Sequence, residues 1–151
     1  MAVNRFSRLV ELRRLREEAQ GGEYAKVLAD LNDLKQQVTL LDQETEQARA
    51  DALDLVGDHT TILSGDMIAG FFEGQKVRRT RLLEAVEKSE PLVEAAKQRW
   101  LEARKGLRQA EKLEEKTDLK LQKEALRVEN RMLDMAGVVR HIRQQDKETM
   151  L

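Results

Sequence analysis

Apolar residues in the first part of the chain recur at alternating spacings of three and four residues. This alternation is the heptad pattern of an α-helix that packs along a partner helix rather than around a globular core. Only one of the positions is polar, Thr45. The chain is therefore expected to form a rod that works by contact with other proteins. We call these positions the first seam: Tyr24, Val27, Leu31, Leu34, Val38, Leu41, Thr45, Ala48, Ala52 and Leu55.

The composition agrees with a rod. In the 151 residues aromatics are 3% and charged residues 36%, which leaves few large apolar side chains for a compact core. The 27 basic and 28 acidic residues nearly cancel, so net charge does not indicate a nucleic-acid binder. With no cysteine and 2 histidines, a disulfide framework, thiolate chemistry or a histidine metal cage is not expected, and no cofactor is predicted.

The N-terminus lacks the apolar core of a secretory signal. The longest apolar stretch, Met67 to Phe72, is too short to cross a membrane. We therefore expect a cytoplasmic protein.

The first helix is predicted over about residues 5–56, where only Gly21 and Gly22 interrupt good helix formers. Upstream of that pair Leu12, Leu15 and Ala19 fall out of phase with the first seam. The pattern predicts a register slip or a bend around residues 19–24.

Glycine and small polar residues concentrate at about 57–65, which predicts a turn that contains His59 and a possible helix cap at Ser64. A second helix is predicted over about 66–147. Pro91 lies inside it and predicts a kink, with a fresh helix beginning at Pro91 as the alternative. The second seam, by which we mean its heptad positions, comprises Leu82, Val86, Ser89, Val93, Ala96, Trp100, Ala103, Leu107 and Ala110.

Together the seams predict an all-α fold, two long helices in an antiparallel coiled-coil hairpin forming a single domain over 1–151. With the turn near residue 61, position i on the first helix faces roughly position 123 minus i, which pairs Tyr24 with the neighbourhood of Trp100 and Phe6 with that of Thr117. Acidic residues then run beside basic ones. The acidic set is Asp42, Glu44, Glu46, Asp51 and Asp54, and the basic set is Lys76, Arg78, Arg79 and Arg81.

The second helix is longer than the first, and residues after about Asp118 are predicted to overhang without an intramolecular partner. Beyond the polar Glu114 and Thr117 the apolar phase shifts by a four-residue stutter. Homodimerisation, disorder or insertion into a larger partner would each account for an uncovered stripe. We call this set the C-terminal stripe: Leu121, Ala125, Val128, Met132, Met135, Val139 and Ile142.

Two helices that share one groove offer no concave, partly dry site, so an enzyme is not predicted. His59 is interpreted as a solvated turn residue, and His141 as complementing a helix dipole. Phe71 and Phe72 point about 100° apart on a helix, so either one of them is exposed or both tuck under the turn. The basic N-terminal turn is either solvated surface or a docking site for carboxylates. Its arginines are Arg5, Arg8, Arg13, Arg14 and Arg16.

The opening run from Arg5 to Arg13, RFSRLVELR, and the run from Glu129 to Ala136, ENRMLDMA, complete a pattern that resembles the FliJ family. FliJ proteins are small coiled-coil components of the flagellar type III export apparatus. The YscO-type stalk proteins of virulence secretion systems are the close alternative. The resemblance implies a non-enzymatic cytoplasmic stalk, peripheral to the membrane, whose partners are a hexameric export ATPase, a membrane-embedded export-gate protein and export chaperones.

The resemblance also implies where these partners would bind. The export-gate surface falls at Gln37, Leu41, Phe71, Phe72 and Gln75, near Leu82. The contact with the ATPase ring is predicted at Arg8, Arg13, Arg16, Leu121, Val128, Met132, Met135, Val139 and Ile142.

Two functions of other classes stay open on the sequence. One is a structural homodimeric coiled coil that tethers other proteins, and the other is a chaperone-like hairpin that holds unfolded chains. For the stalk, a monomer or a weak homo-oligomer is expected, whereas a tether requires an obligate dimer.

Overall fold

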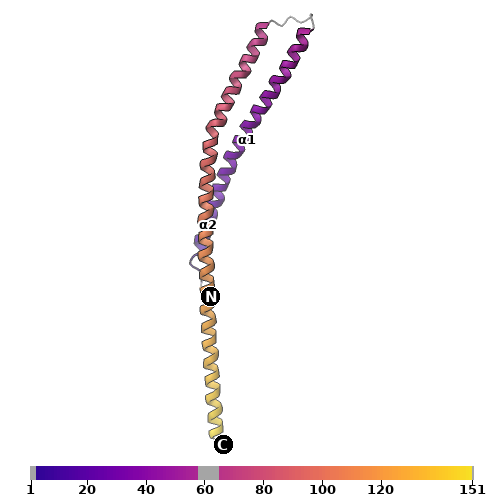
Figure 1. The fold of residues 1–151 in the computed structure, drawn as a ribbon. Helices are drawn as coiled ribbons and strands as arrows, with labels where there is room; N and C mark the ends of the chain where they lie inside the picture. Colours follow the sequence, from indigo (N-terminus) through magenta and orange to yellow (C-terminus); the bar gives the residue numbers. More distant parts are fainter. Residues whose placement is uncertain (1–2, 58–64, 151) are drawn as a thin grey trace. The chain divides into compact units, whose positions relative to one another are not determined.

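A computed structural model describes residues 3–57 and 65–150 of the chain (Figure 1). Helix α1 spans Ser7–Gly57 and helix α2 spans Gly65–Thr149, with 51 and 85 residues. No strand occurs in these two ranges. The all-α prediction with a longer second helix is confirmed. Most of the predicted turn, with His59 and Ser64, lies outside the described residues.

The chain divides into two compact units, which are described separately. Unit 1 comprises Met1–Leu15 and Arg104–Leu151, and unit 2 comprises Arg16–Ala103. In each unit a stretch of α1 lies beside a stretch of α2 (Figure 1). The prediction of a single domain stays a prediction.

In unit 2 the two helices run antiparallel. The rings of Tyr24 and Trp100 stack with centroids 5.6 Å apart, and further along α1 the Asp42 carboxylate accepts a 2.9 Å bond from Arg79 Nε. Higher numbers on α1 thus face lower numbers on α2. The predicted neighbourhood of Tyr24 and Trp100, and the pairing of acidic with basic residues, are confirmed at these two contacts.

The first seam supplies the packed face of α1 in unit 2. Leu31 and Leu41 are buried, and the other members are half-buried apart from Leu55, which lies at the margin of exposure. On α2, Ala96 and Ala103 are buried, because small side chains allow the two backbones to approach closely. The heptad pattern therefore identifies the buried face.

Of the two alternatives around residues 19–24, the register slip is wrong, and the bend stays a prediction. Within unit 2, Glu17 and Gln20 continue the three-and-four spacing upstream of Tyr24 and are half-buried, whereas Ala19 is exposed. Polar side chains with long apolar stems can occupy a seam when their ends find partners or water. Glu17 has such a partner, because its carboxylate accepts a 3.0 Å hydrogen bond from the Trp100 indole.

Pro91 lies inside α2, which continues on both sides of it. The alternative of a fresh helix beginning at Pro91 is therefore wrong. The Pro91 side chain is exposed, so water can reach the carbonyl that loses its N–H partner.

In unit 1 the start of α1 is fixed by Asn4. The Asn4 side-chain oxygen accepts a 2.9 Å bond from Phe6 N, and its backbone carbonyl accepts one from Ser7 N at 3.2 Å. Its amide donates 2.8 Å bonds to the Glu114 carbonyl and to Asp118 Oδ1 of α2. Asn4 thus closes a turn before α1 and also ties that turn to α2.

Beyond this tie, α2 continues alone within unit 1. Leu121 is half-buried, and every residue from 122 to 150 is exposed. Figure 1 shows this end of α2, coloured from orange to yellow, without a second helix beside it. The predicted overhang is confirmed.

Candidate interaction surfaces

In unit 1 the C-terminal stripe is exposed from Ala125 to Ile142. Met132 and Met135 are 67% and 69% exposed. From Ala125 to Ile142 the stripe extends about 26 Å along one side of the helix, at 1.5 Å per residue. Exposed apolar surface of this extent is typical of sites that contact another protein, a membrane or a ligand.

Further exposed apolar side chains on the same length of α2, away from the stripe, were not predicted from the sequence. Leu119, Leu126 and Leu133 repeat every seven residues and are exposed. They lie about 100° or more around the helix from the stripe, so a search for alternating spacings of three and four passes over them. A search at a period of seven would have found them.

The predicted ring-contact arginines have different surroundings. In unit 1, Arg8 is exposed, whereas Arg13 is half-buried and its guanidinium lies against Gly106 of α2. Arg14 of the same unit lies 3.9 Å from Glu111. Arg16 belongs to unit 2 and is exposed. In unit 1, Arg8 is therefore more available to a partner than Arg13.

In unit 2 an apolar groove lies between the last turns of α1 and the first turns of α2. Phe71 is 42% exposed, and its ring meets the ring of Phe72 edge-on at 5.4 Å. Phe72 is half-buried, so the two neighbours differ in exposure as their offset on the helix predicts. The groove is lined by Ala48, Asp51, Ala52, Leu55, Met67, Ile68, Phe71 and Phe72.

The remaining predicted gate residues lie further from that end of unit 2. Gln37 is exposed and donates to Asp33 at 3.1 Å. Leu41 is buried in the first seam, and Leu82 is half-buried. Gln75 is 3% exposed, so its side chain is enclosed between the helices.

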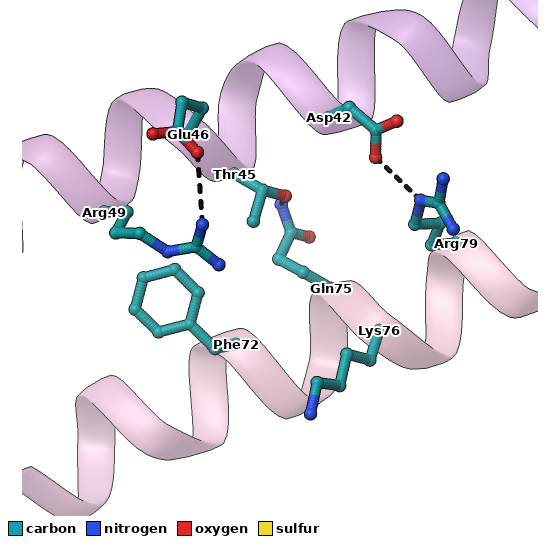
Figure 2. A pocket seen from close by; sticks show the side chains of 8 residues that line it. All are labelled: Asp42, Thr45, Glu46, Arg49, Phe72, Gln75, Lys76 and Arg79. Atoms are coloured by element: carbon teal, nitrogen blue, oxygen red, sulfur yellow. Dashed lines mark hydrogen bonds and ion pairs between the residues drawn. The ribbon is translucent and has the colours of Figure 1, made fainter.

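Figure 2 shows the cleft beside Gln75, where charged side chains from both helices surround one polar contact. The Gln75 amide donates to Thr45 Oγ1 at 3.2 Å, and Thr45 Oγ1 donates to the Leu41 carbonyl at 2.8 Å. Among the residues that the structure describes, three ion pairs lie around this contact. The pairs are Asp42 with Arg79, Glu46 with Arg49, and Glu73 with Lys76.

Neither a membrane span nor a metal cluster is found in the described part of the chain. No helix within 3–57 and 65–150 is long and apolar enough to cross a membrane. Among the same residues, no three His, Cys, Asp or Glu side chains are grouped to hold a metal ion.

These features define a two-helix coiled-coil protein with exposed apolar surfaces. The family model described as flagellar FliJ protein matches residues 1–146. Comparisons with curated proteins and with solved structures gave no match. The chain therefore belongs to the FliJ family. Members of this family are non-enzymatic components of the flagellar type III export apparatus.

Proposed function

We propose that the chain is a cytoplasmic stalk that inserts its α2 overhang into the bore of a hexameric export ATPase. The observation that carries the proposal is the exposure of the C-terminal stripe from Val128 to Ile142. In proteins most of the stability of a helix comes from packing of its apolar face, and a surrounding ring would supply that packing for the stripe.

In unit 1 the proposed ring contact combines the stripe with Arg8 and Arg13, and Arg16 is proposed as a separate contact on unit 2. Arginine suits bidentate contact with carboxylates on a partner, and the stripe supplies apolar contact. A surface of scattered methionines and valines biases a neighbour without holding one subunit tightly, which suits a shaft inside a ring.

Turnover by the cognate hexameric ATPase tests this proposal. Wild type should stimulate turnover, and the variant Met132→Asp with Met135→Asp should not, because two charges interrupt the apolar contact. The matched control is Asn130→Asp with Gln144→Asp, which adds the same charge on the opposite face and should stimulate as wild type does. If the Met132→Asp with Met135→Asp variant stimulates turnover as strongly as wild type and the control variant do, the proposal is wrong.

We also propose that the unit 2 groove at Phe71 and Phe72 contacts the membrane-embedded export gate, with Gln37 on the same unit. Leu41 and Gln75 would support this surface from beneath, since both are buried. An exposed aromatic pair beside small alanines suits an apolar anchor from a partner.

Binding to the isolated cytoplasmic part of the gate protein tests the second surface. Phe71→Ala should weaken binding at least about tenfold, as loss of an aromatic anchor does. Val77→Ala removes a side chain of similar exposure elsewhere on α2 and should leave binding unchanged. If both variants bind as wild type does, the groove is not the gate contact.

Escort of export chaperones, and a peripheral position at the inner face of the membrane, complete the proposal. The tether alternative makes a different prediction for the free protein. Light scattering across a dilution series should give a monomer or a weak dimer for the stalk and a dilution-insensitive dimer for the tether.

A further inference from the structure

The apolar seams of unit 2 do not by themselves determine how far α1 slides along α2. Both helices repeat Leu, Val and Ala at heptad spacing, so a slip of seven residues again sets apolar side chains against apolar side chains. Such a slip would move one helix along the other by about 10 Å. Something other than the repeated aliphatic residues has to select the observed register.

We infer that unit 2 carries two register-determining contacts, a polar one between Thr45 and Gln75 and a steric one between Gly21 and Trp100. This inference concerns the pairing of the helices and does not depend on the proposed stalk function. Figure 2 shows Thr45 and Gln75 extending toward each other from α1 and α2.

The polar contact discriminates because Gln75 is buried. In the observed register its amide nitrogen donates to Thr45 Oγ1 at 3.2 Å. A heptad slip would place Val38 or Ala52 opposite Gln75, and neither side chain can accept that bond. Thr45 keeps its bond to the Leu41 carbonyl in every register, so the buried amide of Gln75 is the group that loses its partner.

The loss is confined to the amide nitrogen. The Gln75 side-chain oxygen accepts a 3.2 Å bond from Arg78 on the same helix, and a slip leaves that bond intact. An unsatisfied buried amide disfavours a slipped register by about tenfold or more. Single polar residues inside a coiled-coil seam select register in this way, at some cost in stability.

The steric contact lies further along the same pair of helices. Trp100 occupies the space above Gly21, where a Cβ atom would lie 3.1 Å from the indole Nε1. A heptad slip in one direction would bring Leu28 opposite Trp100, and its side chain would occupy the volume that the indole takes. The Glu17 carboxylate also accepts its bond from the indole only in the observed register.

These contacts give buried Gln75 a role that does not require it to touch a partner. A Gln75 variant that fails to bind the export gate would do so because Phe71 and Phe72 then lie beside different residues of α1. Gln75 is in this sense a positioning residue, and a readout of register separates that role from direct contact.

Engineered cysteine pairs measure the register, because the natural chain contains no cysteine to compete. Asp42→Cys with Arg79→Cys joins side chains that touch in the observed register. Arg49→Cys with Arg79→Cys, and Lys35→Cys with Arg79→Cys, report slips of seven residues in the two directions. Each pair is placed in the full-length protein and equilibrated in a thiol redox buffer.

In the wild-type seam only the Asp42 and Arg79 positions should cross-link. Thr45→Val with Gln75→Leu should raise the slipped fraction about tenfold while helical content is kept, because the buried amide that disfavours the slip is replaced by an apolar side chain. Adding Trp100→Leu to these two substitutions should raise the slipped fraction further, until the slipped and observed registers cross-link to a similar extent. Trp100→Leu alone removes the steric contact and should raise the slipped fraction less than the combined variant does, because the polar contact still favours the observed register.

Two results would overturn the inference. One is slipped cross-linking in the wild-type seam as strong as that of the observed pair. The other is a combined variant, helical by circular dichroism, that still cross-links only at Asp42 and Arg79. If the combined variant does not fold, the ratio of slipped to observed cross-links in Thr45→Val with Gln75→Leu decides, and an unchanged ratio contradicts the polar contact.

Discussion

The indole ring of Trp100 lies nearly parallel to the phenol ring of Tyr24, at an interplanar angle of 12° with 5.6 Å between centroids. The same indole also donates a hydrogen bond to the Glu17 carboxylate and covers Gly21. A Cβ at position 21 would lie 3.1 Å from the indole Nε1, closer than ordinary van der Waals contact, so the ring fits here because residue 21 has no side chain. Gly21 therefore serves packing, although glycine inside a helix costs about 0.5–1 kcal/mol relative to alanine.

The adjacent glycines should respond differently to the same substitution. Gly22 has open space where a Cβ would be added, so Gly22→Ala should raise the free energy of unfolding by about 0.5–1 kcal/mol. At Gly21 the new methyl group would press on Trp100, and Gly21→Ala should be less stable than Gly22→Ala by about 1 kcal/mol. Urea unfolding of both variants measures the difference, and equal gains would contradict the packing role.

Replacing Asn4 should loosen the start of α1 in unit 1. Asn4→Ala removes the bond from Phe6 N and both interhelical bonds, and should lower the free energy of unfolding by about 1–2 kcal/mol. Asn4→Asp retains an acceptor for Phe6 N but has no amide to donate to Glu114 and Asp118. Hydrogen exchange of the first turns of α1 should be faster in both variants, and more so in Asn4→Ala.

A result in which Asn4→Asp matches wild type in both exchange and unfolding would show that only the turn matters. If both variants match wild type, the hydrogen bonds from Asn4 to α2 do not stabilise the protein.

The ion pair between Asp42 and Arg79 should contribute little, despite its 2.9 Å geometry. Their side chains are 47% and 49% exposed, so water screens the attraction. A double-mutant cycle with Asp42→Asn and Arg79→Gln should give a coupling energy of about 0.2–1 kcal/mol that declines as salt is added. A coupling well above this range, insensitive to salt, would mean that the pair is far less hydrated than its exposure indicates.

The heptad pattern was enough to predict the fold class, the longer second helix, the neighbourhood of Tyr24 and Trp100, and the overhang. Each of these follows from apolar periodicity on a single helix together with the position of the turn. The predicted slip around residues 19–24 failed because the seam there continues through Glu17 and Gln20, and a count of apolar residues ignores polar ones.

The fit between facing side chains could not be predicted from the pattern within either helix alone. Gly21 admits Trp100, Gly106 admits the Arg13 guanidinium, and Thr45 accepts from Gln75. All three depend on which residues meet across the interface, and periodicity within one helix carries no information about size or hydrogen-bonding partners on the other. The candidate surfaces are limited in the same way: Gln75 looks available on a single helix and is buried in the pair, whereas the burial of Leu41 follows from its place in the first seam.

Removal of residues 125–151 should leave the paired part of the molecule intact. Every side chain from 122 to 150 is exposed, so truncation removes almost no buried apolar surface, and the free energy of unfolding should change by less than about 0.5 kcal/mol. Stimulation of the export ATPase should be lost at the same time, because the truncation deletes the stripe. Urea unfolding and ATPase turnover on the same preparation test both parts. A truncated chain that unfolds at much lower urea would mean that the overhang stabilises the paired helices, whereas one that still stimulates turnover would assign the ring contact to the region around Arg8.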